Sequence, residues 1–176
     1  MSRNLNRHAG RLPTLAAQAR IDTPLGALTA AATATGLAGL WFDGQAHHPG
    51  PLDAPLVPDH PHIARARAQL ERYWRAEAVD FDDVPLDLHG TPFQRLVWQA
   101  LRRIARGYTC SYGDIAVAIG APAAVRAAGA AIGRNPVSVI VPCHRVLGRG
   151  GALTGYAGGL QRKQSLLQLE QTATAR

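Results

Sequence analysis

The chain has 176 residues, of which 47% are hydrophobic and 18% charged, and its net charge is +7. This balance is typical of one or two small globular domains and excludes an intrinsically disordered chain. No apolar run is long enough to cross a membrane, and the basic N-terminus lacks the apolar core of a signal peptide, so we expect a cytoplasmic protein.

The charge is unevenly distributed between the two halves. Residues 1–88 contain eight Arg and ten acidic residues, whereas residues 89–176 contain ten Arg, one Lys and two acidic residues. A basic half with almost no acid favours a phosphate-binding surface over a generic solubility effect. The two cysteines, Cys110 and Cys143, are too few for a disulfide framework and should stay reduced.

The first half predicts a small sheet followed by a helix. We interpret residues 1–18 as a flexible tail. Residues 18–45 contain short β-prone runs separated by Pro and Gly, which predict two or three antiparallel strands. Residues 45–61 form a His- and Pro-rich segment whose irregular spacing favours a solvated loop over a metal site. Apolar residues at helical spacing then predict a helix over 62–76.

The second half begins after a polar connector, residues 80–90, so we place the domains at 19–88 and 89–176. Thr91 and Gln94 form a capping box with a proline between them, which starts a helix ending near Gly107. The apolar face of this helix is expected to consist of Phe93, Leu96, Val97, Ala100, Leu101 and Ile104. Ser111 and Asp114 resemble a second capping box, which opens a short helix that ends at Gly120.

A third helix is predicted over residues 123–135, "AAVRAAGAAIGRN", and with the preceding one it suggests a helix-turn-helix. Its surface is almost all Ala and Gly. A helix that reads the major groove would carry Asn, Gln and Arg for the base edges, and these are scarce here. A smooth helix suits the minor groove, but equally suits tight packing against another helix.

The sequence places Cys143 and His144 side by side. Taken alone, the pair is a weak signal, because buried cysteines are common and usually inert. A reactive thiol needs a nearby base or positive charge, which His144 and Arg145 supply. Neighbours on a strand face opposite ways, so cooperation requires a bend in the backbone or a bridging water. Glu170 is either the acid that orients His144 or a surface charge on the last helix.

The motif "IVPCHRVLGRGGALTGYAGGLQRKQSLLQLE" and the preceding "GTPFQRLVWQAL", "SYGDIA" and "AVRAAGAAIGRNP" resemble the O6-alkylguanine-DNA alkyltransferase family, also called methylated-DNA–protein-cysteine methyltransferases. The resemblance covers residues 90–170 in unbroken motif order and is looser before that. It implies a mixed α/β (α+β) fold. The N-terminal domain would be RNase H-like with a small antiparallel sheet. The C-terminal domain would be mainly helical, with a helix-turn-helix or winged-helix-like DNA-binding motif.

The resemblance also implies catalytic roles. Cys143 is the acceptor of the alkyl group, and His144 acts as its general base through a water molecule. Glu170 orients His144, and Asn135 shapes the bend that holds the site together. Tyr112 crowds the phosphate 3′ to the target and hydrogen-bonds the guanine.

Further implied roles concern DNA and the base pocket. Arg126 fills the gap that the flipped base leaves in the stack. The other implied DNA-binding residues are Tyr112, Ser111, Ala127, Gly129 and Arg134. The pocket residues are Pro142, Val146, Tyr156, Ala157 and Gly158. The backbone N–H of Ala157 would lie near the guanine O6, without the side-chain hydroxyl that a serine gives some relatives.

The function implied is direct-reversal DNA repair. The protein would flip an O6-alkylguanine out of double-stranded DNA through the minor groove and transfer the alkyl group once, irreversibly, to Cys143. No cofactor, metal or membrane is expected, and the protein is expected to be a monomer. Activity on O4-alkylthymine and cooperativity on DNA stay open, as do two rival functions. One is an alkyltransferase-like protein that only flags lesions, and the other is a cysteine hydrolase.

Overall fold

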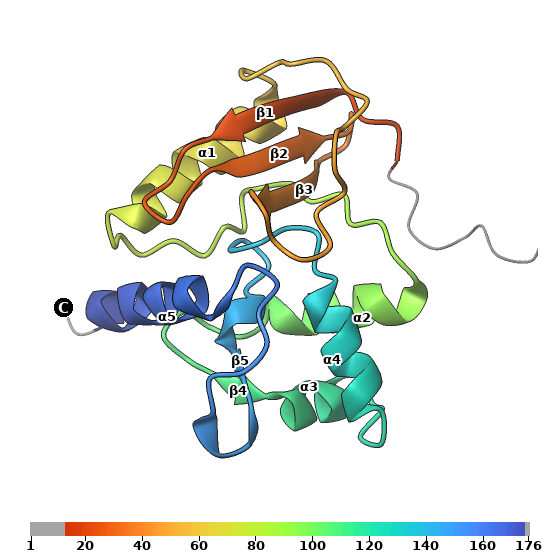
Figure 1. Ribbon diagram of the computed structural model, residues 1–176, viewed down its shortest axis with the longest axis vertical. Coiled ribbons are helices and arrows are strands. Elements are labelled where there is room, and N and C mark those ends of the chain that lie inside the picture. The colour runs from red at the N-terminus through yellow and green to blue at the C-terminus, as the bar shows by residue number, and fades with distance from the viewer. Residues whose placement is uncertain (1–12, 175–176) are drawn as a thin grey trace, which may run out of the picture.

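The computed structural model describes residues 13–174. Its upper layer in Figure 1 is a three-stranded antiparallel sheet in the order β1 (Ala17–Ile21), β2 (Leu28–Ala32), β3 (Leu37–Phe42). This confirms the predicted antiparallel strands. β1 begins inside the segment expected to be a tail, because Ala17 is buried and pairs with Ala32. The rest of that expectation, residues 1–12, lies outside the described residues.

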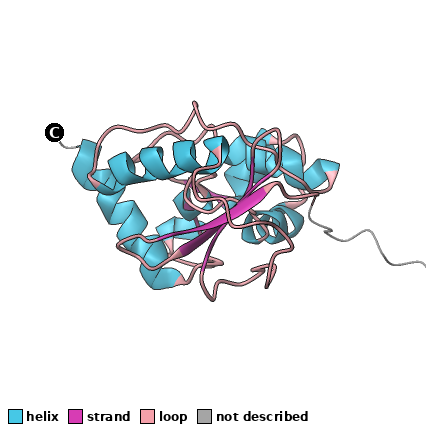
Figure 2. Cartoon of the chain, turned by 90° about the horizontal axis from the view of Figure 1, so that it is seen from above, coloured by secondary structure: helices cyan, strands magenta, loops and turns pink. Residues whose placement is uncertain are grey.

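One face of the sheet is covered by α1 (Pro61–Trp74), which contacts all three strands (Figures 1 and 2). Its buried side chains are Ile63, Ala66, Leu70 and Tyr73, a spacing of three and four residues that places them on one helical stripe. The predicted helix is therefore confirmed. Every residue of β3 is buried, since α1 and the second half of the chain enclose it.

The second half is mainly helical (Figure 1). Its elements are α2 (Pro92–Leu101), β4 (Cys110–Ser111), α3 (Tyr112–Ala118), α4 (Val125–Gly133), the 3-10 helix η1 (Cys143–Arg145), β5 (Val146–Leu147), the 3-10 helix η2 (Arg149–Gly151) and α5 (Leu160–Thr174). The helices α2, α3 and α4 pack on one another, as expected of a helix-turn-helix unit. Among the described residues, no helix is long and apolar enough to span a bilayer.

Both capping boxes are present as predicted. The Thr91 hydroxyl accepts from the Gln94 N–H while the Gln94 side chain accepts from the Thr91 N–H. Ser111 and Asp114 make the same reciprocal pair at the start of α3. These bonds satisfy N–H groups that have no partner within the helix, so each helix begins where its box stands.

The prediction for α2 was wrong in two details. The helix ends at Leu101 instead of near Gly107. The Arg102 N–H still bonds four residues back, to Trp98, but the Arg103 and Ile104 N–H groups bond only three residues back. Leu96, expected on the apolar face, is 50% exposed. Trp98 is buried instead, and its indole N–H donates to the Ala131 carbonyl at 2.9 Å, which fixes α2 against α4.

The two halves share a sheet edge. Leu40 of β3 forms a parallel bridge with Val137 of the second half. Leu37 forms a similar bridge with Leu86, which belongs to the first half. The segment from Val137 leads directly into Cys143. The N-terminal sheet therefore holds the strand-like segment that delivers the cysteine.

Candidate active site

Cys143 lies at a sharp bend in the chain. The 3-10 helix η1 is one turn long and consists of Cys143, His144 and Arg145. It follows Pro142 and leads directly into β5. Of the two arrangements expected to let Cys143 and His144 cooperate, a bend or a bridging water, the backbone bend is thus present. All three residues of the turn are buried, and Cys143 is 5% exposed.

Asn135 holds the approach to this bend. Its side-chain N–H donates to Cys143 Sγ at 3.0 Å and to the Val141 carbonyl at 2.7 Å, while Oδ1 accepts from the Val137 N–H at 3.0 Å. Val139, inside the loop so formed, has φ of 70°, a left-handed conformation that is rare for a β-branched residue. Such strain persists only where the surroundings enforce it, as the Asn135 bonds do here.

A buried carboxylate stands behind the histidine. Glu170 Oε1 is 2.7 Å from His144 Nε2. The Arg145 guanidinium binds the same carboxylate in bidentate fashion, with Nε and Nη2 each 2.9 Å from a carboxylate oxygen. Burial alone would raise the pKa of Glu170, but His144 and Arg145 outweigh it and hold that pKa well below its usual range. Glu170 is therefore ionised, and the surface-charge alternative for it is wrong.

The histidine is poised as a neutral base. Burial lowers the pKa of His144, although Glu170 opposes that shift. Nε2 faces Glu170, while Nδ1 is buried without a hydrogen-bond partner among residues 13–171. One ring nitrogen is thus held by the carboxylate, and the other is left to take up a proton.

The cysteine needs that base. Burial raises the pKa of the Cys143 thiol, and the Asn135 hydrogen bond and the Lys163 charge only partly offset it. The resting side chain is therefore a thiol at neutral pH. Because the thiolate is the nucleophile, reaction requires a nearby group to remove the proton.

A cavity of about 230 Å³ opens onto Cys143. Its walls come from α3, α4, the loop before α5 and the loop after β3. The lining residues are Ala46, His47, Tyr112, Gly129, Ile132, Gly133, Cys143, Gly155, Tyr156 and Ala157. The cavity brings together Tyr112, Gly129, Tyr156 and Ala157, which the resemblance had assigned to DNA or the base.

Three residues expected in the pocket lie elsewhere. Pro142 is the N-cap residue of the 3-10 helix η1, and Val146 is fully buried in β5, paired with Cys110 of β4. Gly158 supports Tyr156, because a Cβ at Gly158 would stand 2.7 Å from the Tyr156 ring. These residues shape the pocket without lining it.

Lys163 was missed as a site residue. It is fully buried in α5, and its ammonium group donates to the carbonyls of Val146 and Thr154 at 2.6 Å and of Gly155 at 3.1 Å. These bonds fasten both ends of the 146–155 loop. The Tyr112 hydroxyl donates to the same carbonyls of Thr154 and Gly155 at 3.3 Å. No local motif signals a buried lysine, so sequence reasoning had no sign of this tether.

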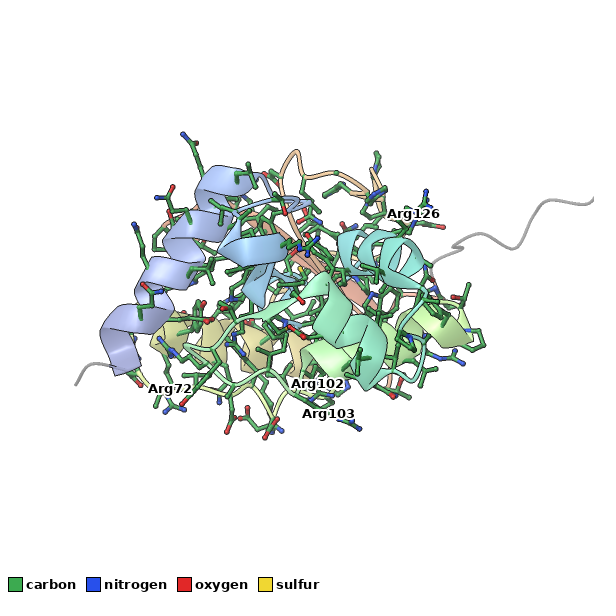
Figure 3. The ribbon with its side chains drawn as sticks, turned by 90° about the horizontal axis from the view of Figure 1, so that it is seen from below. Arg72, Arg102, Arg103 and Arg126 are labelled. Carbon is green, nitrogen blue, oxygen red and sulfur yellow. The ribbon has the colours of Figure 1, made fainter. Side chains whose placement is uncertain are left out.

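The helix α4 shows two faces. Ala128, Ala131 and Ile132 are buried, whereas Arg126, Ala127 and Ala130 are exposed. Small residues therefore serve packing on one side and leave a smooth surface on the other. Arg126 lies on the outer side of α4, apart from Arg102 and Arg103 (Figure 3). The exposed Arg134 ends the same helix, and Ser111 is occupied as the cap of α3.

The basic half is less free than its composition suggests. Arg145 is tied to Glu170, and Lys163 is buried among carbonyls. The Arg106 guanidinium donates to the Glu77 carbonyl and lies 4.9 Å from the Tyr73 ring centroid. Fewer of these cations can therefore contact phosphate than the net charge implies.

The second thiol has no comparable surroundings. Burial raises the pKa of Cys110, and the Asp114 charge raises it further. A thiol in this state is a poor nucleophile. Within the part of the chain that the structure describes, no three His, Cys, Asp or Glu side chains gather as a metal site would require.

Comparisons with known proteins agree over most of the described chain. Residues 18–88 match the family "6-O-methylguanine DNA methyltransferase, ribonuclease-like domain", and residues 92–172 match its "DNA binding domain". The chain is 48% identical to a "Methylated-DNA--protein-cysteine methyltransferase" of Mycobacterium tuberculosis strain H37Rv, over 86% of this chain and 90% of that protein. A Haemophilus influenzae protein of the same name is 49% identical over 62% of each chain. The structure titled "Mycobacterium tuberculosis OGT in complex with DNA" matches with a TM-score of 0.83 and 45% identity, covering 89% of this chain and 94% of that one.

Proposed function

This chain belongs to the 6-O-methylguanine DNA methyltransferase family, and we propose that it repairs O6-alkylguanine in duplex DNA by moving the alkyl group onto its own Cys143. The mixed α/β fold, with its ribonuclease-like N-terminal domain and DNA-binding C-terminal domain, belongs to that family as well. The enzyme class is methylated-DNA–protein-cysteine methyltransferase.

The observation that carries the proposal is that a cavity opens onto Cys143 and that a buried His144–Glu170 pair follows Cys143 in the chain. Cys143 lines the cavity, and the ionised Glu170 contacts His144 behind it. If Glu170 lay on the surface it could not orient His144, and if Cys143 lay outside the cavity it could not reach a bound base. Asn135 donates a hydrogen bond to Cys143 Sγ and so supports the backbone bend at Cys143.

The proposed reaction follows from these contacts. His144 Nδ1 removes the Cys143 proton through a water molecule, and Glu170 stabilises the imidazolium that results. The thiolate electron pair then forms the S–C bond as the C–O6 bond breaks, and guanine retains the bonding pair and gains one proton. No group in the site can hydrolyse the thioether, so each molecule reacts once.

We propose that DNA approaches α4 through the minor groove. The exposed Ala127 and Ala130 allow a close approach, and the exposed Arg126 and Arg134 would contact DNA from the same helix. Flipping the base costs a few kcal/mol, which Arg126 offsets by filling the vacated space. Tyr112, beside Gly129 in the cavity wall, is suited to contact the flipped guanine.

The proposal also covers the roles of the two domains, the oligomeric state and the cellular location. We propose that residues 19–88 form a structural domain and residues 89–176 the DNA-binding domain, acting together as a monomer. We also propose that the protein acts in the cytoplasm, where a thiol such as Cys143 stays reduced.

Mass spectrometry tests the proposal directly. The protein is mixed with a duplex that contains one O6-methylguanine, and both intact protein and peptides are weighed. We expect one methyl group per molecule, on the Cys143 peptide. Cys143→Ala should abolish transfer and retain lesion binding, whereas the matched Cys110→Ser should react normally.

The same experiment separates the rival functions. Tight lesion binding without any methyl gain would indicate a protein that only flags lesions. Repeated turnover on an ester or amide would indicate a cysteine hydrolase. A methyl group on Cys110 would overturn the assignment of the nucleophile.

A further inference from the structure

The wall of the Cys143 cavity is completed by the N-terminal half of the chain. Ala46 and His47 lie in the loop after β3, and both line the cavity with residues of α3, α4 and the loop before α5. This loop turns toward the C-terminal half (Figure 1). Neither residue belongs to a motif that the chemistry described above uses.

The loop is fastened in place. The Ala46 N–H donates to the Ala157 carbonyl at 2.9 Å. The buried Gln45 side chain accepts from the Phe42 N–H at 2.8 Å and from the Ser138 hydroxyl at 2.9 Å. The backbone on the N-terminal side of His47 is therefore anchored, and the exposed His47 side chain forms part of the cavity wall.

The position of His47 in the cavity follows from these bonds. Ala46 is hydrogen-bonded to Ala157, so the next residue, His47, lies near the Ala157 part of the wall. His47 and Cys143 line the same cavity. An alkyl group presented to Cys143 in the proposed reaction therefore occupies a cavity whose wall includes His47.

We propose that His47 limits the size of the alkyl group that the site accepts. Displacement by Cys143 requires sulfur, carbon and O6 to lie in line, so everything else on the reacting carbon projects sideways into the wall. A methyl group needs little sideways room, whereas a butyl or benzyl group must displace the imidazole. This inference rests on the proposed function and adds a specificity-determining residue from the N-terminal half.

The backbone at this position suggests a mild substitution. His47 has φ of 62°, in the left-handed region that glycine adopts without strain and asparagine tolerates. His47→Gly and His47→Asn therefore shorten the side chain without opposing the backbone. His48→Gly is the matched control, since the His48 ring lies outside the lining and has its centroid 6.0 Å from that of Trp41.

The test is a set of single-turnover rates with duplexes that carry O6-methylguanine or O6-benzylguanine. We expect His47→Gly to raise the benzyl-to-methyl rate ratio by about ten-fold, as expected when a steric limit in a pocket is removed. His47→Asn should give a smaller increase, and His48→Gly should retain the wild-type ratio. Thermal unfolding of each variant establishes that it is folded.

Two failures are distinguishable. If wild-type protein transfers no methyl group, the proposed function is wrong. If wild-type protein transfers normally but the ratio in His47→Gly stays unchanged or falls, His47 does not limit alkyl size and the inference is overturned.

Discussion

Tyr73, near the end of α1, donates a hydrogen bond of 2.8 Å to Glu170 Oε1 in α5, although 97 residues separate them. The same oxygen is 2.7 Å from His144 Nε2. Burial raises the pKa of Tyr73 well above its usual value, and the Glu170 charge adds to the shift, so the hydroxyl remains a donor. A helix of the sheet domain thus contacts the carboxylate that orients the proposed base.

Removing this donor should change the acid–base behaviour of the site. In Tyr73→Phe, Glu170 loses one of its donors and becomes a stronger acceptor from His144, which raises the pKa of His144. We expect the acid limb of the rate profile with free O6-benzylguanine to move to higher pH. We also expect the free energy of unfolding to fall by about 2 kcal/mol, because the lost bond is to a charged group.

Tyr108→Phe is the control for that prediction, since the Tyr108 side chain is 67% exposed. It should leave both measurements unchanged. A Tyr73→Phe variant that loses stability but keeps the wild-type pH profile would mean that Tyr73 only joins the two halves.

Arg126→Ala should affect DNA repair and free-base reactivity differently. Arg126 is exposed on α4, outside the cavity lining, so its proposed role is in base flipping. Because flipping costs a few kcal/mol, we expect repair of duplex O6-methylguanine to slow by ten-fold or more, as an order-of-magnitude estimate. The rate with free O6-benzylguanine should stay near wild type.

Arg103→Ala is the matched control, because Arg103 is exposed and lies apart from Arg126 (Figure 3). Its duplex rate should change little. Equal slowing of duplex and free base by Arg126→Ala would contradict a role in flipping.

Acid should destabilise the folded chain through His144 and Glu170 together. Burial lowers the pKa of His144, so its contribution is complete above about pH 6.5 and is lost as the pH falls below that value. Glu170 also has a lowered pKa, and its contribution is complete above about pH 4.3 and lost below it. Urea unfolding between pH 8 and pH 3 should show little change above about pH 6.5 and decreasing stability below it, and Glu170→Gln should flatten the loss below about pH 4.3. Stability that rises from pH 7 to pH 5 would refute this assignment.

Lys163→Met should loosen the loop that ends at Gly155. The substitution preserves much of the buried chain but leaves the Val146 carbonyl without its donor. We expect a loss of about 2 kcal/mol in the free energy of unfolding. Amide hydrogen exchange should increase over residues 146–156 while exchange in β2 stays slow. Unchanged exchange in the loop would show that Lys163 is not its tether.

Local signals account for much of what the sequence predicts. The capping boxes at Thr91 and Ser111 define helix starts because each supplies hydrogen-bond partners for backbone N–H groups within the same four residues. The adjacency of Cys143 and His144 likewise calls for a bend or a bridging water wherever the pair acts together. These features depend on neighbours in the chain and can be identified without a tertiary structure.

The features that the sequence does not reveal depend on contacts between distant segments. Tyr73 fits its helical stripe as an ordinary core residue, and nothing local indicates that its hydroxyl reaches Glu170. His47 reads as one histidine of a polar loop, yet it lines the cavity. Leu96 fits the apolar pattern of α2 but is exposed, because Trp98 makes the contact with α4 instead.

The outer strands of the sheet are each partly covered by another segment of the chain. Gln18 of β1 bridges Leu56, and β3 bridges Leu86 and Val137. A bare strand edge is a template on which a second molecule can add and aggregate. Because Val137 belongs to the catalytic half, an N-terminal fragment released by proteolysis would expose part of the apolar β3 edge. The segment that delivers the cysteine therefore also protects the sheet against self-association.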